Sequence, residues 1–424
     1  MQVLFPHSVG LDVHKKTVVA AYITGQDERG DFVFATRTFG TMTGNLLELS
    51  DWLTEAGITH VAMESTGEYW KPVYNILEDL FTLLVVNAQH VKHVPGRKTD
   101  QNDAQWLAQL MTFGLLKASF IPPEGQRELR EMNRARAAMV KERIALVNRL
   151  QKTLESANIK LASVATDVLG VSGRAMLEAL IEGKSESSQM AELAKGRLRS
   201  KREELGNALE GRVKTHHRFI LRELLDQIKG LDSSISRFDA EIESMCLPFE
   251  EAIIHLDTIP GVGKMAAQQI VSEIGIELAS HFPTAGHLCA WAGVAPGNHQ
   301  SGGKVLSRRT RQGNHSLKRV LIESAQAAAR VKDCYLSAQY HRLVGRRGKK
   351  RAIVAVAHSI LTIAYHLIVR KEEYKELGGD YFDKRQPLKT VQTLVSRLGH
   401  LGYEVQLSPK AMPQEGGLTP VFSG

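Results

Sequence analysis

What this chain lacks narrows the kinds of protein it can be. Its 424 residues include three cysteines, which lie far apart and form neither a Cys-x-x-Cys pair nor a Cys/His spacing suited to zinc. We therefore expect no disulfide framework and no structural zinc site, and a reducing cytoplasm fits this cysteine usage. The first residues, MQVLFPHSVG, also lack a basic segment followed by a long apolar run, so no secretory signal is expected.

Long uncharged runs are scarce as well, with one exception. Residues 352–369 carry no formal charge over 18 positions, which is the lower limit for a membrane-spanning helix. His358, Thr362 and His366 nevertheless recur every four residues, which predicts a helix with one polar and one apolar face. We interpret this segment as a buried amphipathic helix and expect no membrane partner.

What is present is a set of four acidic residues in three short motifs. Asp12 stands in VGLDVHKKT, Glu64 in HVAMESTGEYW, and Asp100 and Asp103 in GRKTDQNDA. Asp12 lies in an apolar run that predicts the first strand of a hairpin, and Glu64 ends another apolar run before a Ser-Thr-Gly turn. Asp100 and Asp103 are three residues apart, just before a helical pattern, which places both on one face of a helical turn.

Carboxylates that converge in this way would repel one another unless a cation lay between them. Mg²⁺ prefers hard oxygen ligands and relies on one or two carboxylates per ion, together with substrate phosphate oxygens. We therefore predict a site for Mg²⁺, or for Mn²⁺ in its place, that acts on nucleic-acid phosphates. The alternative is structural: Asp12 and Glu64 would be turn residues, Asp100 a helix cap and Asp103 an acid in the favourable first turn.

The positive charge of the chain is concentrated in one segment. The net charge is +8, yet residues 301–351 contain 14 Lys and Arg against two acidic residues, Glu323 and Asp333. Lys and Arg that neutralise phosphates release counterions, so this segment favours a nucleic-acid partner over a merely solvated surface. The residues expected to contact nucleic acid are Lys304, Arg308, Arg309, Arg311, Lys318, Arg319, Arg346, Arg347, Lys349, Lys350 and Arg351, together with Lys264 farther upstream.

Two long helical patterns lie between the acidic motifs and the basic segment. Residues 127–155 place apolar positions among many Arg and Glu, and residues 221–245 alternate apolar spacings of three and four, which is a heptad seam. With the charged connection between them, roughly residues 170–205, they favour an antiparallel hairpin or a coiled coil between subunits. A simple bundle within one chain is equally compatible with the pattern.

A Gly-rich turn and a serine complete the candidate site. IPGVGK, which runs into an amphipathic pattern from Lys264, resembles the turn of helix-hairpin-helix DNA-binding elements, whose backbone N–H groups approach a phosphate. Ser301 follows in the Gly-rich segment NHQSGGK, just ahead of the basic residues. It could act as a nucleophile beside a DNA phosphate, whereas its chemistry alone favours an ordinary loop serine.

The order of these motifs resembles that of one known family. GLDVHKKT, MESTGEYW, KTDQNDA, the IPGVG turn, and the AGVAPG, SGGK and RRTRQGNHSLKR segments together are similar to the transposases of the IS110 (IS-one-ten) insertion-sequence family, which also includes Piv-type DNA invertases. The resemblance extends over approximately residues 5–370. It implies an α/β N-terminal domain of the RuvC-like (RNase-H-type) fold with a DEDD acidic set, a helical coiled-coil middle, and a mainly α C-terminal transposase domain containing the helix-hairpin-helix-like element.

Domain boundaries follow from this resemblance and from the length, which is too great for one ordinary core. We expect a RuvC-like catalytic domain over residues 1–120 and a coiled-coil oligomerisation domain over 121–247. A C-terminal transposase domain over 248–380 and a tail of unknown role over 381–424 would follow.

The resemblance also implies a reaction. Asp12, Glu64, Asp100 and Asp103 would be the catalytic acids and metal ligands, and Ser301 would attack DNA to form a phosphoserine linkage. A noncoding bridge RNA would pair with both donor and target DNA. The enzyme would be a homo-oligomer, a dimer or a tetramer, in which Ser301 approaches the acids of another subunit. Its setting would be the cytoplasm of a bacterium or archaeon, in association with the nucleoid.

Three other functions remain open from the residues alone. A RuvC-like Holliday-junction or structure-specific endonuclease would use the same acids with water as the nucleophile and would not need Ser301. A kinase or actin-like ATPase shares the RNase-H-type fold, but the chain lacks Gly-rich nucleotide loops and the basic segment would be left unexplained. A regulatory DNA-binding protein would catalyse no reaction and would need none of the four acids.

Overall fold

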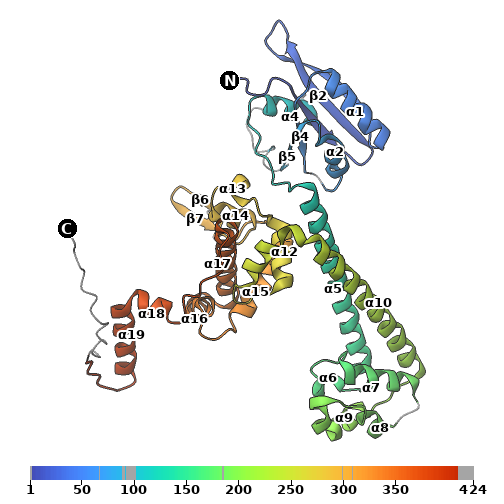
Figure 1. Ribbon diagram of the computed structural model, residues 1–424, viewed down its shortest axis with the longest axis vertical. Coiled ribbons are helices and arrows are strands. Elements are labelled where there is room, and N and C mark those ends of the chain that lie inside the picture. The colour runs from blue at the N-terminus through green and yellow to red at the C-terminus, as the bar shows by residue number, and fades with distance from the viewer. Residues whose placement is uncertain are drawn as a thin grey trace, which may run out of the picture. The chain divides into compact units, whose positions relative to one another are not determined.

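The structure, a computed structural model, describes residues 2–65, 67–87, 91, 102–183, 186–297, 299–307 and 309–408. The chain forms two compact units, Met1–Pro123 and Glu124–Gly424 (Figure 1). The first unit is built on a β-sheet, and the second consists mainly of helices.

The first unit contains a mixed five-stranded sheet with the strand order β3-β2-β1-β4-β5. Strand β1 is antiparallel to β2, and β2 to β3, whereas β4 is parallel to both β1 and β5. This order places β1 and β4 side by side at the centre, and the strands predicted for the Asp12 and Glu64 motifs are confirmed. The strands are β1 (Ser8–Val13), β2 (Thr17–Gln26), β3 (Phe32–Gly40), β4 (His60–Glu64) and β5 (Thr82–Val86).

One face of this sheet packs on two helices, α1 (Thr43–Glu55) and α2 (Trp70–Leu77). Side chains alternate along a strand, so the odd-numbered residues of β1, namely Val9, Leu11 and Val13, all point to this face. They are buried in one apolar cluster with residues of α1 and α2. Full burial of an aliphatic side chain contributes about 1.5–3 kcal/mol, which is why this face fixes the position of the strands.

The opposite face of the sheet is covered by α4 (Asp103–Thr112). Ser8 Oγ lies 2.9 Å from Thr112 Oγ1, which fixes the C-terminal end of the helix against β1. Gly10 allows the closest approach, because a Cβ added there would come within 2.1 Å of the carbonyl oxygen of Ala104. Only glycine leaves room for this contact of helix with strand.

The second unit begins with a two-helix arm formed by α5 (Glu124–Ser156) and α10 (Thr215–Met245). Arg136 pairs with Asp239, and Arg143 pairs with Asp232. The later residue of α5 thus pairs with the earlier residue of α10, so the two helices are antiparallel. The hairpin alternative is therefore present within the chain, and a coiled coil between subunits stays a prediction.

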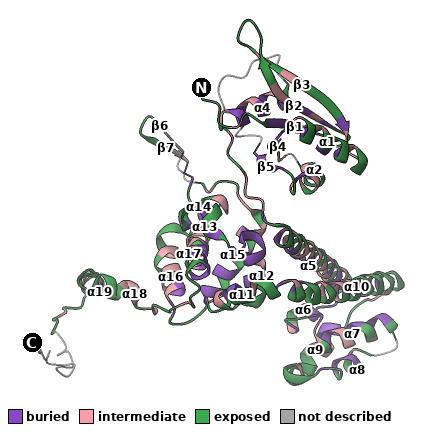
Figure 2. Cartoon of the chain, turned by 45° about the horizontal axis from the view of Figure 1, so that its top comes forward, coloured by how far each residue is buried: buried purple, intermediate pink, exposed green. Residues whose placement is uncertain are grey.

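The far end of the arm is covered by a small helical domain. The charged connection predicted between the two long helices folds into short helices that carry buried residues (Figure 2). Their buried side chains share one core with Leu150 of α5 and Leu225 of α10. These helices are α6 (Leu161–Val164), α7 (Val171–Glu182), α8 (Ser187–Ala191), the 3₁₀ helix η1 (Gly196–Lys201) and α9 (Arg202–Leu209).

The C-terminal helices pack around α17 (Lys349–Arg370), the one helix of the described residues that is long and apolar enough to cross a membrane. Val356, Ile360 and Ala364 of α17 are completely buried among these helices, which confirms the predicted buried helix. The other elements are η2 (Leu247–Phe249), α11 (Glu250–Asp257), α12 (Lys264–Ile274), α13 (Leu278–His281), α14 (Ala285–Trp291), α15 (His315–Ala328) and α16 (Tyr335–Arg347).

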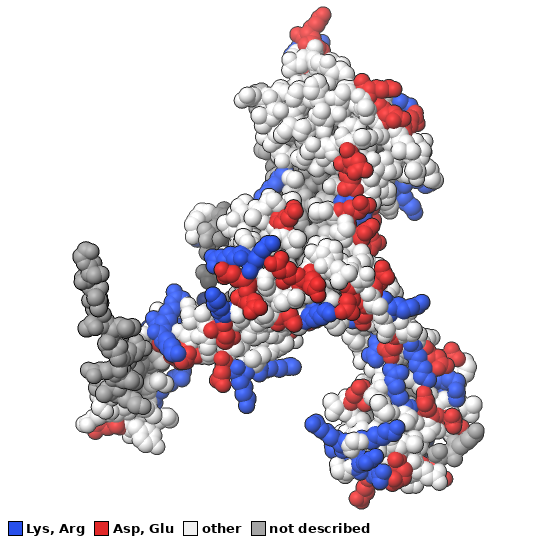
Figure 3. All heavy atoms as spheres, in the orientation of Figure 1, with Lys and Arg blue, Asp and Glu red and all other residues white. Residues whose placement is uncertain are grey.

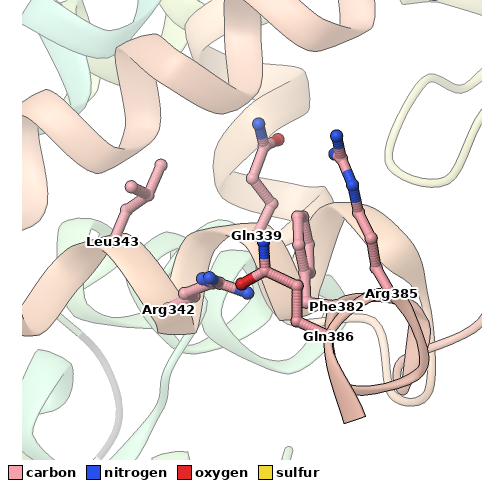
Figure 4. A pocket seen from close by; sticks show the side chains of 6 residues that line it. All are labelled: Gln339, Arg342, Leu343, Phe382, Arg385 and Gln386. Carbon is pink, nitrogen blue, oxygen red and sulfur yellow. The ribbon is translucent and has the colours of Figure 1, made fainter. Parts of the chain in front are cut away.

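The tail predicted from residue 381 begins with two helices, α18 (Tyr381–Arg385) and α19 (Pro387–His400). The guanidinium of Arg342, on α16, lies over the ring of Phe382, 5.1 Å from its centroid. This contact closes one side of a cavity of about 220 Å³, so α18 is attached to α16 (Figure 4). The cavity is lined by Gln339, Arg342, Leu343, Phe382, Arg385 and Gln386.

Candidate active site

The register of the central strands brings Asp12 and Glu64 to neighbouring positions. Leu11 of β1 is paired with Met63 of the parallel strand β4, so the next residue on each strand is Asp12 on one and Glu64 on the other. Leu11 and Met63 belong to the cluster on the α1 and α2 face, and side chains alternate. The two partly buried carboxylates therefore stand on the face covered by α4, at the carboxyl ends of the strands.

Asp103 approaches the same edge from α4. The helix contacts Ser8 through Thr112, at its C-terminal end, and contacts Gly10 through Ala104, in its first turn. It therefore runs along the even-numbered positions of β1, with its N-terminus towards the carboxyl end of the strand. Asp103 is the first residue of this helix and is exposed. Three of the four predicted acids are thus brought to one edge of the sheet.

The fourth acid, Asp100, lies outside the described residues. The N-cap of α4 is Asn102, whose side-chain oxygen accepts a hydrogen bond of 2.8 Å from the backbone N–H of Gln105. The structural alternative that made Asp100 the cap of this helix is therefore wrong. Asp103 does occupy the first turn, where a negative charge is favourable near the helix N-terminus.

The chemistry of these donors suits a divalent cation, because all are hard carboxylate oxygens. Within the described part of the chain, however, no three His, Cys, Asp or Glu side chains are close enough to hold one metal ion together. Asp12 Oδ2 lies 3.1 Å from Nε2 of His14, a residue outside the predicted site. The signal for His14 is its place two residues after Asp12 in the same motif.

Ser301 lies at the tip of a two-stranded hairpin formed by β6 (His299–Ser301) and β7 (Lys304–Ser307). Ser301 is paired with Lys304, and the two residues between them, Gly302 and Gly303, have φ values of 55° and 75°. A type I′ turn requires positive φ at both central positions, which explains the two glycines. Ser301 belongs to the second compact unit, whereas the three described acids belong to the first.

Close backbone contacts hold the base of this hairpin. The N–H of Gly297 donates a 2.9 Å hydrogen bond to the carbonyl oxygen of Arg309, and Pro296 forms a bridge with Thr310. A Cβ on Gly313 would come within 2.4 Å of the backbone nitrogen of Gly293. The glycines of the AGVAPG and RQGN segments thus let the two flanking backbones meet.

A buried carboxylate outside the predicted motifs joins this region to the arm. Glu273, at the end of α12, is 2% exposed, and Nε and Nη2 of Arg134 each donate a 2.8 Å hydrogen bond to its carboxylate. Nη2 of Arg130 donates to the Glu273 carbonyl at 2.6 Å, and burial lowers the pKa of Arg130 to about 10. The available signal is one acidic residue in the otherwise uncharged segment QQIVSEIG.

The predicted nucleic-acid contacts lie in the second unit, and most are exposed. Lys318 is half-buried and donates a 3.0 Å hydrogen bond from Nζ to Thr310 Oγ1, and Arg308 lies outside the described residues. A second basic group, residues 346–351, spans the end of α16 and the start of α17. The exposed members are Lys264, Lys304, Arg309, Arg311, Arg319, Arg346, Arg347, Lys349, Lys350 and Arg351.

The Gly-rich turn between α11 and α12 is packed against α15. Gly261 has a φ of 84°, and a Cβ there would lie 2.4 Å from the backbone nitrogen of Ala328. Lys264 Nζ donates a 2.5 Å hydrogen bond to Glu243 Oε1, and this bond raises the pKa of Lys264. Gly261 is therefore needed for helix packing, while a phosphate contact of Lys264 stays a prediction.

Comparison with known proteins agrees with the order of these elements. The DEDD transposase model of the IS110 type matches residues 9–159, and a model described as "Transposase IS116/IS110/IS902 family" matches residues 254–342. The chain is 27% identical over 300 residues, 69% of this chain and 72% of the relative, to the transposase for insertion sequence element IS1111A of Coxiella burnetii. It is 26% identical over 322 residues, 74% of this chain and 85% of the relative, to a probable family 20 transposase of Pseudomonas aeruginosa.

A further relative is the pilin gene-inverting protein of Moraxella bovis, 30% identical over 149 residues, which cover 34% of this chain and 46% of that protein. Its name fits the relation to DNA invertases expected from the motifs. The DEDD match lies on the sheet unit and the arm's first helix, which supports a RuvC-like fold for that unit. Two matches in the order expected, together with relatives that cover most of the chain, show that this protein belongs to the IS110 family and is a DNA transposase.

Proposed function

We propose that this transposase is a site-specific recombinase, guided by a bridge RNA, that cuts and rejoins DNA with Ser301 as nucleophile and with Mg²⁺ held by four acids. One observation carries the proposal. Asp12 and Glu64 occupy neighbouring positions at the ends of two central parallel strands, and Asp103 begins the helix that covers the same face.

The acids would be held by rigid elements rather than by loops. The register of β1 and β4 fixes two carboxylates, and the contact of Gly10 with α4 fixes the third relative to them. Asp12, Glu64, Asp100 and Asp103 would hold Mg²⁺, or Mn²⁺ in its place. A divalent ion, when bound, stabilises the negative charge that develops on phosphate oxygens. His14 would move away from Asp12 when that carboxylate takes up this role.

Ser301 would supply the nucleophile. Its Oγ would form a bond to phosphorus while the bond from phosphorus to one deoxyribose oxygen breaks, and its proton would pass to a carboxylate or to water. The leaving strand would carry a free hydroxyl, and the protein would carry a phosphoserine. A deoxyribose hydroxyl from the second DNA would then attack this phosphorus and release Ser301. One phosphodiester bond is thus formed for each one broken, and strand joining needs no nucleoside triphosphate.

The basic residues would hold the nucleic acids. Lys304, Arg309 and Arg311 are exposed on and just after the hairpin that carries Ser301, so phosphate contacts there would bring a DNA strand towards the serine. The bridge RNA would supply sequence choice by base pairing to donor and target. The names of the relatives support DNA as the substrate, since they include transposases and a gene-inverting protein.

The acids and the serine lie in different compact units, which supports an oligomer with shared sites. We propose that Ser301 of one subunit serves the acids of another. An Asp12→Ala chain mixed with a Ser301→Ala chain should then regain part of the recombination activity that neither has alone. If verified mixed oligomers stay inactive, each subunit uses its own serine.

The test of the reaction is a denaturing-gel assay for a covalent protein–DNA adduct. It uses the purified protein with its co-purified RNA, element-end DNA and Mg²⁺, beside the Ser301→Ala variant and a matched Ser307→Ala control. A metal-dependent adduct that is lost only in Ser301→Ala supports the serine mechanism. DNA cleavage that survives in Ser301→Ala without an adduct would instead identify a RuvC-like endonuclease that uses water as the nucleophile. One observation favours this alternative: the three described acids lie in one compact unit, and Ser301 lies in the other.

A further inference from the structure

The small domain at the end of the arm has a strongly basic segment. Residues 195–202, KGRLRSKR, hold five Lys and Arg and no acidic residue. The domain lies between the two family matches, which cover residues 9–159 and 254–342, so neither match accounts for it. We call these residues the arm-tip basic segment. Outside residues 301–351 the chain as a whole has more acidic than basic residues, but residues 195–202 are a local exception with an excess of positive charge.

The backbone of the segment presents its cations to solvent. Most of it forms the 3₁₀ helix η1, and Leu198 packs against the apolar core at the end of the arm. In a 3₁₀ helix successive side chains lie about 120° apart, so anchoring Leu198 directs its two neighbours away from the core. Arg197 and Arg199 are both exposed, and so is Lys195.

Few of these cations are paired. Arg202 Nη1 lies 3.0 Å from Glu192 Oε2, and Lys201 lies only within 4.0 Å of Glu204. Lys195, Arg197 and Arg199 form no ion pair within the part of the chain that the structure describes. Along the shaft of the arm, by contrast, Arg136, Arg143 and Lys229 each have a carboxylate partner. In Figure 3 Lys and Arg side chains gather on the left of this domain.

We propose that the arm-tip basic segment binds the phosphate backbone of duplex DNA that flanks the cleavage site. The inference rests on the proposed function, because it takes DNA as the substrate held by the C-terminal helices. Exposed, unpaired Lys and Arg gain affinity for phosphates by releasing condensed counterions. Arg guanidinium groups, which form two of the three unpaired cations, also suit the bidentate geometry of phosphate oxygens.

The length of the arm supports duplex DNA as the partner. Arg134 is fixed to α12 through Glu273, and α5 continues to Ser156 beside the small domain. At 1.5 Å per residue this part of the helix spans about 33 Å, close to one turn of B-DNA at about 34 Å. Duplex DNA is stiff over this distance, since its persistence length is about 50 nm. A duplex held at the base of the arm can therefore meet the tip one turn farther along.

The experiment measures the affinity of the full protein, with its RNA, for two DNA duplexes that contain the same cleavage site. One duplex ends near this site, and the other extends about 20 base pairs farther on each side. The variant Lys195→Gln/Arg197→Gln/Arg199→Gln removes three exposed cations and leaves Leu198 in place. The control Arg222→Gln/Lys229→Gln/Arg237→Gln removes three exposed cations from the shaft of α10. Unchanged thermal midpoints for both variants verify folding.

We expect the extension to raise the affinity of the wild type and of the control at least tenfold, and that of the tip variant less than twofold. The slope of log K against log salt for the long duplex should be less steep in the tip variant by about 3, since each phosphate contact contributes about 0.9. Equal affinities and slopes for all three proteins would overturn the proposal. Loss of co-purified RNA with an unchanged gain from the DNA extension would also overturn it, because it would assign the segment to RNA.

The same samples separate this inference from the proposed function. The tip variant should still form the Ser301 adduct on the short duplex. If no protein forms an adduct but the extension effect persists, the arm contact stands and the serine mechanism fails.

Discussion

Asn314 donates a 2.6 Å hydrogen bond from Nδ2 to Oε2 of the buried carboxylate of Glu273. The oxygen of the same amide caps α15 by accepting from the N–H of Leu317 at 3.0 Å. One side chain thus links the end of α12 to the start of α15. Because Arg130 and Arg134 bind Glu273 from α5, the carboxylate joins the arm, α12 and α15.

Substitution Glu273→Ala should destabilise this junction strongly. Removing one partner of a buried ion pair typically costs about 3–5 kcal/mol, because the other charge is left buried without compensation. Here the group left behind is Arg130, whose side chain is 13% exposed. We expect a loss of about 3 kcal/mol in the free energy of unfolding, measured by urea denaturation, and weaker DNA binding because the cap of α15 loosens.

The control is Glu277→Ala, which removes an exposed carboxylate four residues away. It should change the free energy of unfolding by less than about 0.5 kcal/mol, as surface substitutions usually do. Equal losses in the two variants would show that Glu273 is not the link between arm and helices.

Gly10→Ala should disturb the acidic site from a distance. The added Cβ would meet the carbonyl oxygen of Ala104 at 2.1 Å, and this backbone atom cannot move without moving α4. Because Asp103 begins α4, the variant should lose most DNA cleavage even where the protein remains folded. Gly25→Ala is the matched control, since a Cβ there meets nothing within 4 Å, and it should retain cleavage. Wild-type cleavage by Gly10→Ala would contradict the arrangement described for α4.

The strands and the longest helices could be predicted because their apolar periodicity is strong. The apolar run that contains Asp12 forms β1, and the patterns over 127–155 and 221–245 fall within α5 and α10. The neighbouring positions of Asp12 and Glu64 could not be predicted from either motif alone. They depend on the parallel register of β1 and β4, which is set by burial of Leu11 and Met63 on the other face.

Three features of the structure could not be predicted from the sequence: the burial of Glu273, the short helices of the charged connection and the hairpin that carries Ser301. Glu273 is an ordinary acid in the sequence, and its burial depends on Arg130 and Arg134, more than 130 residues away. The charged connection over 170–205 has no long period because it forms short helices that share the core of the arm. Ser301 was expected in a flexible loop, whereas its glycines form the turn of a hairpin.

The three thiols should react slowly in the folded protein. Cys246, Cys289 and Cys334 are buried and free, and burial raises the pKa of each, to about 11 for Cys246. The thiolate is the reactive form, so little of it is present at pH 8. Titration with a chromogenic disulfide reagent should detect less than one fast-reacting thiol in the native protein and all three in urea. Fast reaction of the native protein would show that these sites open readily.

Asp232 makes the arm sensitive to acid. Burial alone would raise the pKa of Asp232, but hydrogen bonds from Arg143 and Arg174 outweigh it and lower the pKa below its usual value of 3.8. A carboxyl group whose pKa is lowered by folding stabilises the protein above its unfolded pKa and loses this contribution as the pH falls through the folded pKa. The stabilisation is therefore complete at neutral pH and declines below 3.8.

The variant Asp232→Asn tests this directly. Asp232 accepts hydrogen bonds from Arg143 of α5 and Arg174 of α7, so the variant should lower the free energy of unfolding at pH 7 by about 1–2 kcal/mol. The difference from wild type should shrink as the pH is lowered, because the wild-type carboxyl group then becomes neutral too. Asp226→Asn, an exposed acid on the same helix, should show little change at either pH. A loss in Asp232→Asn that is equally large in acid would mean that shape rather than charge holds α5, α7 and α10 together.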